Sequence, residues 1–178
     1  AEDLDSLSGR QHLSTVYREA GDFKKSIEIA TEIIEHDGQN IGAKLNLAFC
    51  SSQLGDSVRA ERMIKEVQAD NPDNFSCKLH LCLIYIYTCK YGKAKERLEK
   101  LIKANPNNVG VKLNLAHCLG LMGKSDRAIR IINDVLADNP DDFSAKLLLA
   151  ITYRESGNYE SAISILKSVM KINPSHIN

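Results

Sequence analysis

The chain has 178 residues, enough for one or two domains, and its 23 basic side chains balance its 23 acidic ones. A net charge of zero argues against a whole-surface attraction to nucleic acid or to an anionic membrane. The most apolar run, residues 79–87, is too short to cross a bilayer and is interrupted by His80. We therefore expect no nucleic-acid partner and no direct membrane insertion.

A repeat of 34 residues organises the sequence. The four prolines all lie 34 residues apart, and each follows an asparagine: Pro72, Pro106, Pro140 and Pro174. Four glycines fall on the same spacing, with Cys89 in the one missing place: Gly21, Gly55, Gly123 and Gly157. A spacing this regular indicates that one supersecondary unit is stopped at the same point each time.

We divide the chain into an acidic N-terminal extension, residues 1–6, and five repeats in a single array. The repeats are 7–40, 41–74, 75–108, 109–142 and 143–176. The array begins and ends abruptly, and we expect it to be a fragment of a larger protein. Below, "repeat position" counts from 1 at the first residue of each repeat.

Each repeat carries two apolar stripes with helical spacing. Position 7 is always leucine, position 8 is always small and position 11 is mostly large, which is one face of a helix. Position 20 is again small, and positions 24 and 27 are aliphatic, which predicts a second helix. The sequence therefore predicts an all-α fold of five helix–turn–helix repeats.

Turn residues separate the two helices. The glycine at position 15 can adopt positive φ and end the first helix. Asp22, Asp56 and Asn158 follow it as N-caps of the second helix, and the proline at position 32 ends that helix. Cys89 breaks the rule in repeat 3, so its turn should be either strained or of another type, and less regular than the others. Repeat 1 has Gly38 in place of the proline, which is still a helix stop.

A longer period of 68 residues is also present. Residues 40–50 return with few changes as residues 108–118, and residues 69–76 return as residues 137–144. Repeats 2 and 3 thus look like a pair that is copied as repeats 4 and 5.

The five cysteines form no C-x-x-C pair, and an odd number cannot all be paired. We expect buried thiols in a reducing compartment, hence a cytoplasmic location, and no disulfide framework, metal or other cofactor. A metal pair of His80 and His117 lacks a third ligand nearby in the sequence.

A 34-residue helix–turn–helix with these positions resembles the tetratricopeptide repeat (TPR) family. Repeat 5 carries the family pattern most fully, in Leu149, Ala150, Tyr153, Gly157, Tyr159, Ala162, Leu166, Val169 and Pro174. The resemblance implies a right-handed α–α superhelix, a TPR solenoid. The first helices would line a concave groove and the second helices would form the convex back. It also implies a scaffold that binds peptides, helices or whole proteins and catalyses nothing.

Repeat position 4 departs from the family pattern, because a basic residue replaces the usual bulky apolar one. The residues are Arg10, Lys44, Lys78, Lys112 and Lys146. We expect their stems to lie on the packing seam with the charges at one edge. The alternative is a basic strip that grips a partner.

By the family's geometry, positions 2, 5, 6, 9, 12 and 13 face the groove. None of these is charged in repeats 2 to 4, while Arg18–Glu19 and Arg154–Glu155 close the two ends. The expected site comprises Leu45, Asn46, Phe49, Leu79, His80, Leu83, Ile86, Tyr87, Leu113, Asn114, His117, Leu121, Leu147 and Ile151.

An apolar groove of this kind fits an amphipathic helix or another apolar segment of a partner protein. Its side chains would lie on the leucines of position 5, with asparagine and histidine side chains bonding its polar edge. Alternatively, these leucines pack on one another and leave little open surface. Chaperone-binding TPR proteins use a carboxylate clamp with Lys at position 5 and Asn at position 9. The chain has neither, so we reject binding of that kind.

Two other functions compete with peptide binding. The first is self-assembly as a homo-oligomer, through the groove and through array ends that leave Leu166, Val169 and Ile172 uncovered. The second is a non-catalytic substrate-binding arm of a larger enzyme, such as a protein glycosyltransferase with an asparagine-lined groove. We find no nucleophile–base pair, phosphate loop or carboxylate pair, and we expect the chain not to be an enzyme.

Overall fold

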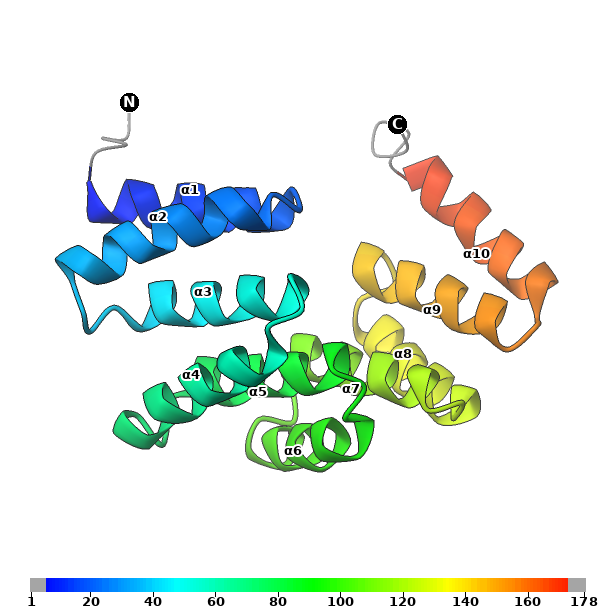
Figure 1. The fold of residues 1–178 in the computed structure, drawn as a ribbon. Coiled ribbons are helices and arrows are strands. Elements are labelled where there is room, and N and C mark those ends of the chain that lie inside the picture. Colours follow the sequence, from blue (N-terminus) through cyan, green and yellow to red (C-terminus); the bar gives the residue numbers. More distant parts are fainter. Residues whose placement is uncertain (1–5, 173–178) are drawn as a thin grey trace. The chain divides into compact units, whose positions relative to one another are not determined.

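The computed structural model describes residues 6–172, and ten α-helices without any strand make up this part of the chain (Figure 1). The helices are α1 (Leu7–Glu19), α2 (Phe23–His36), α3 (Ile41–Gln53), α4 (Ser57–Asp70), α5 (Phe75–Tyr87), α6 (Tyr91–Ala104), α7 (Val109–Leu121), α8 (Ser125–Asp138), α9 (Phe143–Glu155) and α10 (Tyr159–Ile172). The predicted all-α repeat fold is confirmed. Residues 1–5 of the acidic extension and Pro174 lie outside the described residues.

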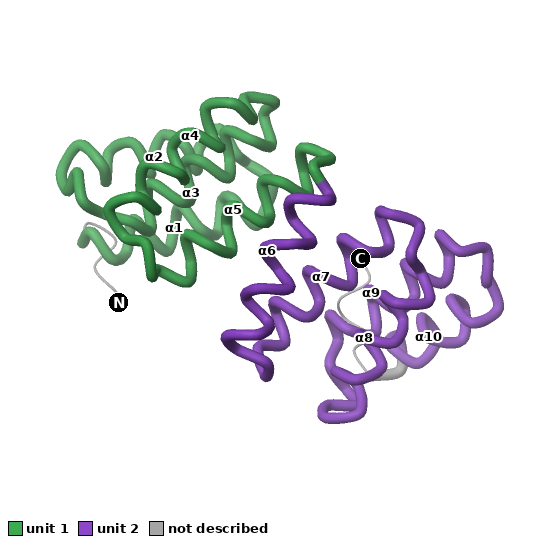
Figure 2. The backbone as a smooth tube through the Cα atoms, turned by 90° about the horizontal axis from the view of Figure 1, so that it is seen from below, with its two compact units in different colours: residues 1–90 green, residues 91–178 purple. Residues whose placement is uncertain are grey.

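The helices belong to two compact units, residues 1–90 and 91–178 (Figure 2). In unit 1, helices adjacent in sequence pack together from α1 to α5, and α3 also contacts α1 and α5. In unit 2, the same order runs from α6 to α10, and α7 also contacts α9. In each unit the first helices of successive repeats therefore lie side by side and form one face.

The core of each unit follows from the two stripes of the sequence. Small side chains at positions 8 and 20 are buried in every repeat and let neighbouring helices approach closely. Larger aliphatic side chains at positions 24 and 27 fill the space beside them, and Ile64, Leu98 and Ile132 are fully buried. Burying each such side chain contributes about 1.5–3 kcal/mol to stability.

Side-chain caps fix where the helices begin. Asp22 and Asp56 accept hydrogen bonds from the backbone N–H groups of Lys25 and Arg59, as the sequence predicts. Asn158 likewise accepts from the N–H of Ser161 at 3.1 Å. The first helices have caps as well, at position 34 of the preceding repeat and at Ser6, which the sequence reasoning overlooked: Ser6, Asn40, Asn74, Asn108 and Asp142.

The turn inside each repeat has the same hydrogen bond in all five copies. The N–H at position 16 donates to the carbonyl at position 11, at 2.8–3.0 Å, and the residue at position 15 has positive φ. Cys89 keeps this turn with φ 56°, beside values of 71–95° for the four glycines. The expected irregular turn in repeat 3 is therefore wrong, and the strained alternative holds.

Replacing Cys89 with glycine is expected to stabilise the protein by about 0.5–1 kcal/mol. A left-handed backbone costs a residue with a Cβ about 1–2 kcal/mol, and the greater flexibility of glycine in the unfolded chain returns part of that gain. Urea unfolding followed by the helical signal measures the difference. The reciprocal change Gly55→Cys should destabilise by a similar amount, because a Cβ there meets no atom within 4 Å and only the backbone is strained.

An ion cluster ties the turn of repeat 3 to the preceding repeat. The Glu61 carboxylate on α4 accepts from Lys90 Nζ at 2.5 Å, from Lys65 Nζ at 2.7 Å and from the Tyr85 hydroxyl at 3.2 Å. Hydrogen bonds from Lys65 and Lys90 hold the pKa of Glu61 at about 2, below its ordinary value of 4.5. The carboxylate is thus ionised in the folded state over nearly the whole pH range.

This lowered pKa makes stability depend on pH in one direction. The contribution of Glu61 is fully present above about pH 4.5, where the carboxyl is ionised in the unfolded chain as well. It falls away as the pH drops from about 4.5 towards 2, because protonation then favours the unfolded chain. We expect Glu61→Gln to lower stability at pH 7 and to flatten its decline below pH 4.5. Parallel pH profiles for the two proteins, measured by urea unfolding, would contradict this role.

All five cysteines lie within the described residues, and none of these forms a disulfide there. Cys50, Cys77, Cys82 and Cys118 are buried, and Cys89 is exposed. Burial raises the pKa of the thiols of Cys50, Cys77 and Cys118, which keeps them protonated and unreactive.

Acidic residues pair with three of the basic residues at position 4. Lys146 contacts Asp141 at 2.9 Å, Lys78 contacts Asp73 at 3.4 Å, and Arg10 contacts Glu32 at 3.8 Å. The stem of Lys146 is largely covered by its neighbours. This arrangement favours charges held at an edge over a basic strip that awaits a partner.

Candidate functional site

The first-helix face of unit 1 buries part of the predicted site. Leu45, Asn46 and Ile86 are only 3–5% exposed, so they serve the core more than a ligand. Four other predicted residues are half-buried and Tyr87 is exposed; the four are Phe49, Leu79, His80 and Leu83. The rings of Phe49 and Tyr87 meet edge to face, with centroids 5.5 Å apart.

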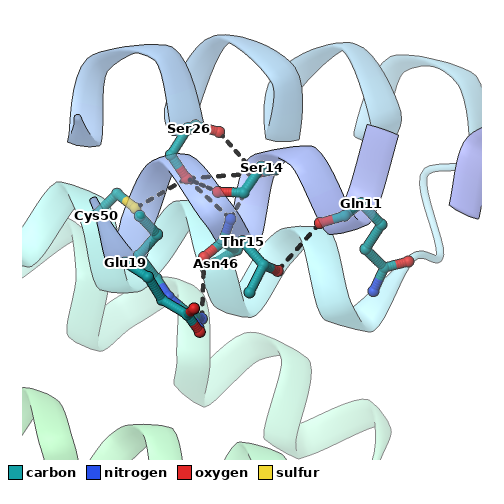
Figure 3. A network of polar contacts seen from close by, with 8 residues as sticks. Gln11, Ser14, Thr15, Glu19, Ser26, Asn46 and Cys50 are labelled. Carbon is teal, nitrogen blue, oxygen red and sulfur yellow. Dashed lines mark hydrogen bonds and ion pairs between the residues drawn. The ribbon is translucent and has the colours of Figure 1, made fainter. Parts of the chain in front are cut away.

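Asn46 belongs to a buried polar network between α1, α2 and α3 (Figure 3). Its Nδ2 donates to Ser14 Oγ at 2.5 Å and to Ser26 Oγ at 2.9 Å. The two serine hydroxyls donate to each other's backbone carbonyls, at 3.0 and 2.8 Å, and Cys50 Sγ donates to Ser26 Oγ. The asparagine amide is thus used inside the protein and does not offer a hydrogen bond to a ligand.

The sequence contained a signal for this network that position-by-position reasoning missed. Only repeat 1 has serine at both small positions, Ser14 at position 8 and Ser26 at position 20. In every other repeat position 20 is alanine. Two hydroxyls in a tight helix–helix contact need partners, and the nearest asparagine supplies them.

Arg18 orders the polar end of this face. Its Nη1 donates to Asn46 Oδ1 at 3.2 Å, its Nη2 pairs with Glu19 at 3.3 Å, and its guanidinium lies 5.6 Å from the centre of the Phe49 ring. The expected Arg–Glu pair is present, and Arg154 similarly pairs with Glu155 at 3.8 Å in unit 2.

A polar cavity of about 250 Å³ lies beside Arg18 in unit 1. Polar side chains from α1, α3 and α5 line it: Gln11, Ser14, Thr15, Arg18, Asn46, Ser76 and His80. Burial lowers the pKa of His80, and the nearby Arg18 charge lowers it further against the opposing hydrogen bond to the Ser76 carbonyl. His80 is therefore neutral near pH 7, and Arg18 supplies the positive charge among these lining residues.

Unit 2 holds an apolar cavity of about 290 Å³ between α7 and α9. The structure brings five predicted residues together there: Leu113, Asn114, His117, Leu147 and Ile151. It adds Phe143, Ser144 and Leu148, which the sequence prediction omitted. Leu121 is exposed on α7 but does not line the cavity.

The residues that were missed come from the start of α9. Phe143 and Ser144 stand at positions 1 and 2 of their repeat, and Leu148 is the leucine of repeat 5 at position 6. In the repeats before it, position 6 is asparagine or histidine. An apolar residue at this groove position was the signal that marks repeat 5 as the more apolar end.

Asn114 occupies the same repeat position as Asn46 but has a different role. Its Nδ2 donates to the Gly110 carbonyl of its own helix at 2.9 Å, and the side chain is half-buried at the cavity wall. The carbonyl oxygen of its side chain therefore faces a wall that a ligand can reach. No lining residue of this cavity is charged at neutral pH unless His117 binds a proton.

Neither metal chemistry nor a membrane span has a basis in this structure. Residues 6–172 contain no group of three or more His, Cys, Asp or Glu side chains arranged to hold a metal ion. None of the described helices combines the length and the apolar character that crossing a membrane requires.

Comparison with known families agrees with the repeat geometry. The tetratricopeptide repeat model matches residues 17–78, 90–151 and 121–178, which together are most of the chain. The chain belongs to the tetratricopeptide repeat family. Its family and fold are those of protein-interaction scaffolds. No curated protein matches this TPR chain in sequence.

Solved structures show the same fold at low sequence identity. A thermophilic TPR protein of Thermus thermophilus has a TM-score of 0.84 at 17% identity, over 97% of this chain and 94% of its own. A TPR protein from Parabacteroides merdae has a TM-score of 0.75 at 22% identity, over 96% of this chain and 66% of its own. MamA of AMB-1 has a TM-score of 0.62 at 24% identity, over 93% of this chain and 98% of its own.

Proposed function

We propose that this TPR chain is a scaffold that binds an apolar segment of a partner protein, in the form of an amphipathic helix, on the first-helix face of unit 2. The observation that carries the proposal is the cavity between α7 and α9. Five of its lining side chains are apolar, and they come from two helices that lie side by side: Leu113, Phe143, Leu147, Leu148 and Ile151.

The residues of this cavity are accessible to a ligand. Phe143 and Leu147 are exposed, and the other three apolar residues are half-buried. An apolar side chain that enters the cavity would remove their surface from water, which stabilises a complex by about 25 cal/mol for each Å² buried. Charged side chains of a ligand would lose their hydration there without gaining an ionic partner.

The polar groups at the rim fit one edge of a helix. Asn114 and Ser144 lie beside the apolar wall and offer an amide and a hydroxyl. A helix with apolar residues at spacings of three and four would place its apolar stripe in the cavity and its polar edge on these groups. The chain lacks the lysines and asparagines of a carboxylate clamp, so we propose no role for an acidic terminal carboxylate.

The buried thiols support a reducing compartment as the place where the protein acts. Four of the five cysteines are buried, and burial raises the pKa of three of them. We therefore keep the cytoplasm as the proposed location.

Selection from a displayed library of random helical peptides, each about four turns long, tests the proposed function. We expect the enriched peptides to carry apolar residues at helical spacing and to bind at least about tenfold more weakly to Leu147→Glu, because a charge then lies in the apolar cavity. Ile163→Glu is the matched control. It places the same charge on an exposed apolar position of α10 that is outside the cavity.

Two results would refute the proposal. One is a selection that enriches no sequence on the wild-type protein. The other is a set of enriched peptides whose affinity is unchanged by Leu147→Glu, while circular dichroism shows that the variant is folded.

A further inference from the structure

Helix α10 exposes an apolar stripe that the other second helices of the chain cover. Leu166, at position 24, is 40% exposed, whereas Ile64, Leu98 and Ile132 at the same position are 0% exposed. Its neighbours along the stripe are exposed too: Tyr159, Ile163 and Met170. The face is thus apolar in the same pattern as four internal interfaces, but among the described residues no helix packs on it.

The internal interfaces show which element fits this face. In each of them a second helix packs against the first helix of the next repeat, as in α2 with α3 and α8 with α9. Position 10 of the incoming helix makes direct contacts. Cys50 Sγ donates to Ser26 Oγ at 3.3 Å, and Cys118 Sγ donates to the Tyr91 carbonyl at 3.4 Å. Position 10 therefore lies against positions 17 and 20 of the preceding second helix.

Helix α1 exposes the complementary half of the same interface. Val16, at position 10 of repeat 1, is 58% exposed, whereas the four residues at this position in the later repeats are at most 2% exposed. At position 3, where the later first helices bury small or medium side chains, α1 has Gly9. An apolar residue at position 10 and a small one at position 3 make α1 the same kind of helix as those that cover the internal second helices.

The two ends also differ in charge. Repeat 1 carries six acidic and four basic side chains, whereas repeat 5 carries four basic and two acidic ones. Opposite net charges favour an encounter between the two ends and disfavour an encounter between two equal ends.

We propose that α10 of one copy of the chain binds α1 of a second copy, head to tail, in the manner of the internal interfaces. Val16 of one copy then lies against Tyr159 and Leu166 of the other. This contact joins two different surfaces, so each bound pair still has one open α1 face and one open α10 face. The copies therefore add in one direction and form chains or closed rings. The contact is separate from the cavity of unit 2.

Light-scattering mass as a function of concentration tests the proposal with two variants. The wild-type mass is expected to rise above that of one chain with concentration, and to rise less in high salt. Val16→Glu and Leu166→Glu should each have the mass of one chain. An equal mixture of the two should have the mass of two chains and no more, since one intact α1 face and one intact α10 face remain.

Each other outcome overturns the head-to-tail contact. A wild-type mass of one chain up to about 1 mM, the weak end of measurable affinity, excludes it. Association of Val16→Glu by itself would mean that two α10 faces pair or that another surface is used. Two variants that stay monomeric when mixed would exclude complementary ends, provided that circular dichroism shows both to be folded.

Cross-linking provides a second measurement if either glutamate variant fails to fold. In a Cys89→Gly background, Val16→Cys and Tyr159→Cys are combined in one chain and oxidised with copper phenanthroline. We expect a ladder of disulfide-linked oligomers that disappears when either new cysteine is omitted. A ladder that persists with only one of them, or no ladder at all, would contradict the assigned contact.

Discussion

Leu98→Ala is expected to lower the free energy of unfolding by about 2–5 kcal/mol. Leu98 stands at position 24 of repeat 3, is fully buried, and lies on α6, which packs against α7. Truncation removes most of the side chain from the core and leaves a cavity that the small neighbouring side chains cannot fill. Urea unfolding followed by circular dichroism measures the loss.

Leu166→Ala makes the matched control, because it is the same substitution at the same repeat position. Leu166 is 40% exposed, so we expect a loss of about 1 kcal/mol or less when the protein is measured at low concentration. Equal losses for the two substitutions would mean that the α10 face is covered in the folded monomer. That result would contradict the exposed stripe on which the head-to-tail contact rests.

Asn46→Leu is expected to cost about 1–3 kcal/mol although leucine has nearly the same size as asparagine. The substitution removes the two hydrogen bonds that Nδ2 donates to Ser14 and Ser26, and the one that Arg18 donates to Oδ1. It leaves buried serine oxygens with fewer partners, and an unsatisfied buried polar group costs more than a hydrogen bond contributes. Urea unfolding provides the measurement.

Asn114→Leu tests whether the cost comes from the network and not from the repeat position. Asn114 bonds only within its own helix among the described contacts, and it borders the apolar cavity. We expect its replacement to change stability by less than about 0.5 kcal/mol. If both asparagines were equally sensitive, position 6 would have a general structural role, and the network of repeat 1 would not be special.

The repeat made most of the fold predictable. A 34-residue period with small residues at positions 8 and 20 and a glycine at position 15 determines two helices, their turn and their contact, because each feature acts locally. The turn at Cys89 shows the strength of this constraint. The pairing around it keeps the same hydrogen bonds even where the backbone is strained.

The site was less predictable because it depends on which side chains meet across repeats. Asn46 and Asn114 sit in almost identical sequences, yet one is buried under two serines and an arginine and the other borders a cavity. The residues that decide this difference, Ser14 and Arg18, lie in the preceding repeat. A groove assigned from repeat positions alone therefore included the buried Leu45 and Ile86 and omitted Phe143 and Leu148.

The central claim is that the cavity between α7 and α9 binds the apolar stripe of a partner helix. Methyl resonances of the folded protein, recorded while an enriched helical peptide is added, test it most directly. We predict that the methyl signals of Leu113, Leu147, Leu148 and Ile151 shift together and saturate at one peptide per chain. Shifts confined to second helices, such as those of Ile64 or Ile132, with the cavity signals unchanged, would contradict the claim.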